Sequence, residues 1–218
     1  MDEALIGRIV EEVLHSLGGD AAGTVHGMPS RTVRVGVSNR HAHLTPEHSD
    51  ILFGPGRRLT PLRPLLQPDQ FASKETITIA TAQGVIPNVR LIGPERKYTQ
   101  VEISRTDAFL LGLDPPIRQS GNLEGSPGCV LIGPAGSVII DHGVILAGRH
   151  LHCHTSEAAV LGLRDRQIIR ARFGGERGGV MENLLVRVGD IHKLELHIDT
   201  DEANAFGLKT GDTAELVY

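Results

Sequence analysis

The organisation of this chain is visible in the stretch His150-Leu151-His152-Cys153-His154-Thr155-Ser156, because three similar stretches occur elsewhere in the 218 residues. Each stretch leads into a Ser, Thr or Asp that opens a short helix with an acidic residue in its first turn. Each helix then closes on a hydrophobic residue and a glycine, a common helix end: Phe53-Gly54, Leu111-Gly112, Leu161-Gly162 and Phe206-Gly207. The sequence therefore predicts one strand-to-helix unit that is used four times.

Residues with metal-binding side chains recur at one position of these units. Four residues before the helix-opening residues Thr45, Thr106, Ser156 and Asp201 stand His41, Glu102, His152 and His197. Alternate residues of a strand share a face, so His43 joins His41 and His150 joins His152, whereas Cys153 points to the opposite face. Zinc takes three or four ligands and keeps an open position in catalytic sites. The six residues suit two metal ions with three protein ligands each.

A cupin motif is the competing interpretation of the first H-x-H pair. The chain nearly matches that motif, with one residue too few after the first glycine, at Gly36, His41, His43, Glu47 and Gly54. In a cupin Glu47 is a ligand, but here it also fits the first turn of a helix that begins after Thr45-Pro46. No second cupin motif follows at a suitable spacing, so we rank this interpretation second. His154 lies at a helix entrance, where we expect it to contact solvent or a metal ligand.

Composition limits the class of protein. Only 3% of the residues are aromatic, so the core must be built from Val, Ile, Leu and Ala. The net charge is -4 and no basic run stands out, which argues against a nucleic-acid-binding protein. No apolar run approaches the roughly 20 residues of a membrane span, and the N-terminus lacks the plan of a signal peptide. Two cysteines are too few for a disulfide framework, which indicates a reducing cytoplasm.

The predicted fold is mainly β. Residues 1–20 are expected to form an amphipathic helix and residues 21–31 a linker rich in Gly, Ala, Ser and Pro. Residues 54–74 contain four prolines and are expected to form an excursion between strands. Many short strands with tight turns favour barrels or sandwiches. We expect strands over residues 32–38, 76–81, 85–92, 98–104, 130–132, 137–140, 167–172, 183–188, 194–198 and 213–218.

Basic residues accompany the metal candidates. Arg90, Arg96 and Lys97 lie just before the strand that delivers Glu102, and further arginines lie in the Pro-rich excursion at Arg57, Arg58 and Arg63. Arginine suits bidentate capture of phosphate oxygens. Beside two metal ions, these side chains indicate an anionic substrate.

Three segments carry a resemblance to a known family. Val37-Ser-Asn-Arg-His-Ala-His43-Leu44, the Glu102 strand and Gly148-Arg-His-Leu-His-Cys-His154 resemble the PduL-type phosphotransacylases, or phosphate propanoyltransferases. The likeness extends from about residue 32 to the end of the chain. It implies two small β-barrels capped by short α-helices. Residues 32–39 plus 148–218 would form the first barrel, and residues 40–147 the second, with the Pro-rich excursion.

The resemblance also implies an activity and a set of site residues. The reaction is the reversible conversion of a short-chain acyl-CoA, propanoyl-CoA or acetyl-CoA, and phosphate to acyl-phosphate and CoA. Two divalent metal ions, usually zinc, are implied: one held by His41, His43 and Glu102, the other by His150, His152 and His197. Arg96 matches the arginine that orients phosphate. CoA contacts are implied at Ser38, Arg63, Arg90 and Asn204, although Arg63 replaces another basic residue of the family.

No Ser-His-Asp arrangement suggests a covalent acyl-enzyme, so we expect zinc-positioned phosphate to attack the thioester directly. In this family, an amphipathic helix and linker ahead of the barrels resemble an encapsulation peptide. Residues 1–20 would then bind shell or lumen proteins of a bacterial microcompartment in the cytoplasm, as in propanediol degradation. A homo-oligomer is also expected. The alternatives that remain are a cupin-like metal enzyme and a non-catalytic metal- or small-molecule-binding module.

Overall fold

The computed structural model describes residues 30–218, of which Arg31–Tyr218 form one compact unit. The helix and linker expected over residues 1–29 lie outside the described residues. Within the described part, no helix is long and apolar enough to cross a bilayer. The strands are β1 (Thr32–Ser38), β2 (His41–His43), β3 (Pro61–Pro64), β4 (Phe71–Ala80), β5 (Val85–Gly93), β6 (Gln100–Ile103), β7 (Ile117–Arg118), β8 (Cys129–Ile132), β9 (Ser137–Ile140), β10 (Val144–Ala147), β11 (His150–Cys153), β12 (Ile168–Phe173), β13 (Gly179–Val188), β14 (Glu195–Asp199) and β15 (Thr213–Val217). The helices are α2 (Pro46–Phe53), α3 (Arg105–Leu111), α4 (Thr155–Leu161) and α5 (Thr200–Phe206).

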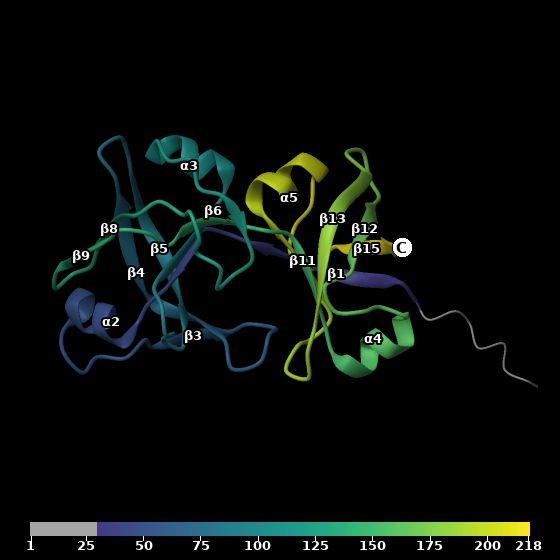
Figure 1. The fold of residues 1–218 in the computed structure, drawn as a ribbon, viewed down its shortest axis with the longest axis horizontal. Coiled ribbons are helices and arrows are strands. Elements are labelled where there is room, and N and C mark those ends of the chain that lie inside the picture. Colours follow the sequence, from purple (N-terminus) through teal and green to yellow (C-terminus); the bar gives the residue numbers. More distant parts are fainter. Residues whose placement is uncertain (1–29) are drawn as a thin grey trace, which may run out of the picture. The chain divides into compact units, whose positions relative to one another are not determined.

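One sheet closes into a barrel with the strand order β1-β14-β11-β13-β12-β15 (Figure 1). Strand β12 shows why it closes around a core, since its residues alternate between exposed and buried along Ile168–Phe173. Val, Leu, Ile and Ala make up most of the interior, as the low aromatic content predicted, but Phe173 and Met181 are buried there too. Val35, Leu151, Leu184 and Leu196 are fully buried. Burial of each such aliphatic side chain contributes about 1.5–3 kcal/mol.

The other sheet has nine strands in the order β7-β10-β6-β2-β5-β4-β8-β9, with β3 paired to β4 at its side (Figure 1). It forms a half-barrel over a separate core that includes Ile79, Leu91, Leu131 and Val144. Strand β10 was not predicted, because its fully apolar run carries no alternation. The mainly β class with short capping helices is confirmed, and the Pro-rich excursion contains the exposed strand β3.

All four helices end at the predicted glycines. Gly112, Gly162 and Gly207 adopt left-handed conformations with φ of 62°, 68° and 65°, which a glycine reaches without steric cost. Gly54 ends α2 with φ of 105°.

The predicted helix starts need a correction. Thr45 is the N-cap of α2, but the other N-caps are Ser104, His154 and Asp199, two residues earlier than expected. Each of these three completes a capping box with the acidic residue three positions later, which satisfies free amides of the first turn. The residue that recurs in all four units is therefore the one two positions before the N-cap: His43, Glu102, His152 and His197.

Candidate metal centres in a shared cavity

The first group of candidate ligands is His41, His43 and Glu102, whose ligand atoms all lie within 4.8 Å of one another. Strand β2 supplies both histidines, and β6 runs antiparallel beside it with Glu102 directly opposite His41. The Nε2 atoms of His41 and His43 lie 3.5 Å and 4.0 Å from the Glu102 carboxylate oxygens. The register of one strand pair therefore gathers the three side chains.

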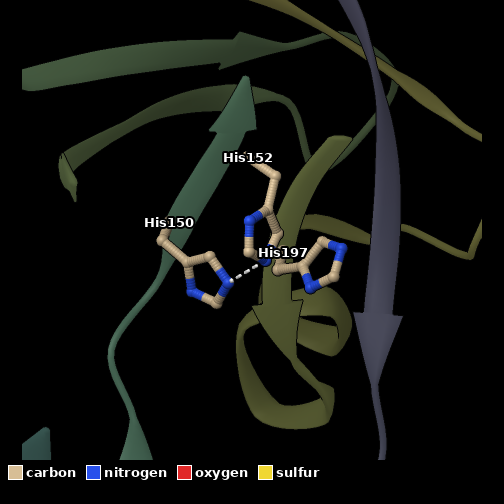
Figure 2. A group of neighbouring side chains, drawn as sticks. All are labelled: His150, His152 and His197. Carbon is tan, nitrogen blue, oxygen red and sulfur yellow. Dashed lines mark hydrogen bonds between the residues drawn. The ribbon is translucent and has the colours of Figure 1, made fainter. Parts of the chain in front are cut away.

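The second group is His150, His152 and His197, again with ligand atoms within 4.8 Å of one another. Strand β11 supplies the H-x-H pair, and antiparallel β14 places His197 directly opposite His150. Figure 2 shows the imidazoles of His150 and His152 turned toward each other, with their Nε2 atoms only 3.1 Å apart and His197 beside them. The two groups thus share one construction, in which the first histidine of each pair faces the third residue across an antiparallel ladder.

Backbone carbonyls orient the imidazoles. The Nδ1 atoms of His41 and His150 lie 2.9 Å from the carbonyls of Asn39 and Gly148, two residues earlier in each case. Nδ1 of His43 lies 3.1 Å from the carbonyl of Ile92. A carbonyl can only accept, so each Nδ1 carries the proton and each Nε2 keeps its lone pair. Metal-binding histidines are commonly held in this way.

Burial sets the charge states of these groups. It lowers the pKa of His43 to about 3, an effect to which the charges of His41 and Arg96 add. It also lowers the pKa of His150 to about 3 and reduces that of His152. Burial opposes ionisation of Glu102, but the facing His41 and His43 outweigh it and lower its pKa to about 2. Near neutral pH these histidines are neutral and Glu102 is ionised, which are the forms that bind metal ions.

The donor set therefore fits divalent cations. The Nε2 atoms of His150 and His152 lie 3.1 Å apart, a separation that requires a proton or a cation between them. In addition, the buried Nδ1 of His152 has no hydrogen-bond partner among the described residues. Three nitrogens, or two nitrogens and a carboxylate oxygen, match the ligands of catalytic zinc sites.

Both groups line one cavity of about 560 Å³ that is bounded by residues of both sheets. The cavity wall is strongly cationic, because six arginines contribute to it: Arg34, Arg40, Arg63, Arg90, Arg96 and Arg187. Arg96 donates to the Ser120 hydroxyl at 3.1 Å. Of the residues expected to contact CoA, Ser38, Arg63 and Arg90 line this cavity. Asn204 does not line it and is exposed on α5.

The structure separates the other candidates from these groups. Glu47, the cupin-type ligand, is exposed in the first turn of α2 and belongs to neither group. His154 caps α4, where its Nδ1 accepts a hydrogen bond from the Ser156 amide at 3.1 Å. Cys153 is buried, and burial raises the pKa of its thiol to about 11.

Three residues that line the cavity or bond to a candidate ligand were not predicted from the sequence. Arg187 stands beside His152 in the parallel pair β11–β13 and is partly buried, and its guanidinium makes no hydrogen bond or close ion pair with a described residue. Gln100 and Glu195 each precede the third ligand by two residues and bond to it. Their spacing, which puts them on the ligand face of the strand, was the available signal.

Comparisons with known proteins identify the family of this chain. The family model for phosphate propanoyltransferase matches residues 34–209. A phosphate propanoyltransferase of Thermotoga maritima is 52% identical over 84% of this chain and 88% of its own length. One of Rhodopseudomonas palustris is 47% identical over 99% and 98%, and one of Salmonella typhimurium is 41% identical over 95% and 93%.

The fold, the cavity and these matches define an acyltransferase, with an acyl-CoA and phosphate as its substrates. The chain belongs to the phosphate propanoyltransferase family.

Proposed function

We propose that this enzyme is a two-metal phosphate acyltransferase whose metal ions, zinc in both sites, are held by the two three-residue groups. One observation carries the proposal: both groups converge in a single cationic cavity. His41, His43 and Glu102 would hold one ion, and His150, His152 and His197 the other. When bound, zinc would supply Lewis-acid polarisation and stabilise a departing thiolate.

Residues of the chain would position the phosphate. Arg96 reaches the cavity beside His43, close enough to affect the protonation of that histidine. Arg187 reaches the same space from β13 and interacts electrostatically with Glu102 and Arg96. Two guanidinium groups this close repel each other, and a bound phosphate dianion relieves the repulsion. We assign phosphate orientation to Arg96 and a supporting role to Arg187.

The transfer step would be direct. A phosphate oxygen forms a bond to the thioester carbonyl carbon, the carbon–sulfur bond breaks, and the electron pair leaves on the CoA sulfur. Holding the two substrates in line is the main contribution of the side chains. Ser38, Arg63 and Arg90 would bind CoA along the cavity. The Arg90 guanidinium donates to the Ser73 and Lys74 carbonyls at 2.9 Å, so it is held in place before CoA arrives.

Thiol release from propanoyl-CoA and acetyl-CoA, with and without phosphate, tests the reaction type. A transferase needs phosphate, a hydrolase releases thiol without it, and a binding module does neither. Removal of the metals, or the changes Glu102→Ala and His150→Ala, should abolish the phosphate-dependent release. His142→Ala is the matched control, because His142 is an exposed histidine in the turn after β9. Intact transfer by the metal-free enzyme would refute the metal proposal.

We further propose that residues 1–20 direct the enzyme into a bacterial microcompartment in the cytoplasm. Support comes from the amphipathic pattern of residues 2–17 and from the family resemblance. Deletion of residues 1–20 should leave catalysis nearly unchanged and abolish co-purification with shell or lumen proteins. Loss of activity on deletion would instead indicate a helix needed by the enzyme itself.

A further inference from the structure

Each third ligand is bonded to the residue two positions before it, and the two pairs have opposite chemistry. The Gln100 amide nitrogen donates to Oε1 of Glu102 at 2.5 Å. The Glu195 carboxylate lies 2.7 Å from Nε2 of His197 and accepts a hydrogen bond from its N–H. The two residues are equivalent, because Gln100 is the cross-strand partner of His43 and Glu195 is that of His152. One half therefore pairs an amide with a carboxylate, and the other pairs a carboxylate with an imidazole.

The Gln100 amide is held in one orientation. Its side chain is fully buried, and its carbonyl oxygen accepts a hydrogen bond from the Gly121 amide at 2.8 Å. Its nitrogen also donates to the Ser120 hydroxyl at 2.8 Å. A flipped amide would lose its bonds to Glu102 and Gly121 and place its oxygen against the Glu102 carboxylate. Gln100 therefore engages Oε1, which leaves Oε2 of Glu102 as the oxygen nearest to His41.

The Glu195 carboxylate occupies a space that a glycine leaves open. Gly36 on β1 is the cross-strand partner of His197. A Cβ atom at Gly36 would lie 2.9 Å from both Cδ and Oε1 of Glu195. A side chain on Gly36 would therefore push the carboxylate out of its position beside the imidazole. The Glu195 side chain is only 12% exposed, so the imidazole is its main polar partner.

Each group of candidate ligands, counted together with its supporting residue, contains one carboxylate. The first group carries one negative charge on Glu102 and is supported by the neutral Gln100. The second contains three imidazoles, which bind a metal ion in their neutral form, and is supported by the carboxylate of Glu195. Each metal ion would thus lie near one carboxylate. In the first group this is the ligand Glu102 itself, and in the second group it is Glu195, two residues before the ligand His197. A carboxylate that accepts the second N–H of an imidazole also makes that imidazole a stronger ligand.

We propose that Gln100 and Glu195 are positioning residues for the two metal centres, and this inference rests on the metal ions of the proposed function. Gln100 fixes Glu102 so that Oε2 binds the metal. Glu195 holds the proton of His197 on Nε2 and leaves Nδ1 for the metal. One ring nitrogen of His197 lies within 4.8 Å of a ring nitrogen of each of the other two imidazoles. His197 would then bind through the opposite nitrogen from His41, His43 and His150, whose Nδ1 atoms face carbonyls.

Metal affinity of the purified full-length enzyme tests this role separately from activity. Zn²⁺ bound per chain and its affinity would be measured by mass spectrometry and chelator competition for Glu195→Ala and Glu195→Gln. We expect Glu195→Ala to bind one of its two metals about 10–100-fold more weakly. Glu195→Gln keeps an oxygen that accepts the N–H and has nearly the same shape, so its loss should stay below about tenfold. Glu215→Ala, which removes an exposed carboxylate from β15, should match the unmodified enzyme.

Nitrogen-15 spectra of histidine-labelled, zinc-loaded enzyme read the ligand atom directly. We expect a metal-bound Nδ1 and a protonated Nε2 at His197, assigned by comparison with His197→Gln. Metal-bound Nε2 at His197, or unchanged affinity in Glu195→Ala, would overturn the proposal. Equal losses in Glu195→Ala and Glu195→Gln would overturn it too, because they indicate direct ligation by Glu195. If the unmodified enzyme binds no metal, the two-metal function itself is refuted, and not only the positioning role of Gln100 and Glu195.

Discussion

His41 and Glu102 are direct partners across the antiparallel β2–β6 ladder, and His41 Nε2 lies 3.5 Å from Oε2 of the carboxylate. The same register recurs between His150 and His197 on β11 and β14. Each candidate metal centre therefore depends on a single strand pair, and removal of one partner should affect one centre.

Glu102→Ala should therefore lose one metal per chain and retain the other. Mutation of a residue that supports a metal ligand typically lowers metal affinity by roughly 10–100-fold. Loss of one of the three ligands themselves should lower the affinity for that metal by at least as much. Phosphate-dependent transfer should fall by about 100-fold or more. Bound metal and thiol release would be measured on the same sample, with His142→Ala as the control. Loss of both metals together would mean that the two groups are not independent sites.

The metal-free enzyme should lose stability as the pH falls below 6.5. In the unfolded chain His43 and His150 bind protons near pH 6.5, but burial lowers their pKa to about 3 in the folded enzyme. The unfolded state then binds more protons, so stability decreases with falling pH between about 6.5 and 3. The slope reaches up to ~1.4 kcal/mol per pH unit for each such histidine.

Glu102 adds to the same trend at lower pH, because its pKa falls from 4.5 to about 2 on folding. Its contribution is present above pH 4.5 and is lost as the pH falls toward 2. Urea unfolding of the metal-free enzyme at pH 7.5, 6.5 and 5.5 measures the histidine part. His43→Gln should flatten the slope, and a slope unchanged by that substitution would contradict the assignment to buried histidines.

Substitution of Arg96 should raise the KM for phosphate more than that for acyl-CoA. A hydrogen bond to a charged group contributes about 1.5–3 kcal/mol, so Arg96→Ala should weaken phosphate binding by about 10–100-fold. Arg187→Ala should act in the same direction with a smaller effect. Arg170→Ala, on the exposed face of β12, is the control. An unchanged KM for phosphate in both Arg96→Ala and Arg187→Ala would show that neither arginine binds phosphate.

Asp107 joins the first centre to helix α3, and its loss should destabilise the fold. It is fully buried, completes the capping box with Ser104, and binds Arg40 through contacts of 2.7 Å and 3.0 Å. Asp107→Asn keeps part of the capping and Arg40 interactions, whereas Asp107→Ala removes both. We expect the alanine variant to lose about 2 kcal/mol of unfolding free energy, and the asparagine variant less. Equal stability of Asp107→Ala and the unmodified enzyme in urea would contradict the structural role.

The sequence contained enough information for the six grouped residues and for the helix ends. H-x-H spacing on a strand places two imidazoles on one face, and a glycine after each short helix marks its C-terminus. Three helix starts were predicted two residues too late. His154 is an unusual N-cap, whereas Ser104 and Asp199 are favoured types that were passed over because Thr106 and Asp201, which follow them closely, are also favoured or helix-compatible. The roles of Gln100 and Glu195 depend on cross-strand register, which no local pattern specifies.

The pairing of strands that are distant in the sequence could not be predicted from local patterns either. Strand β10 pairs in parallel with both β6 and β7, and its apolar run does not distinguish a buried strand from other core segments. Which sheet closes and which stays a half-barrel depends on pairs such as β1 with β15, whose residues lie at opposite ends of the described chain. Arg187 enters the cavity through the same kind of distant pairing, beside His152.

Titration of the metal-free enzyme with Zn²⁺ tests the two-metal reaction most directly. Phosphate-dependent thiol release from propanoyl-CoA and bound metal per chain would be followed together. We predict that activity reaches its maximum only as the second metal per chain binds, and that no thiol is released without phosphate. Full phosphate-dependent activity with no metal, or with one metal per chain, would contradict a reaction that needs both centres.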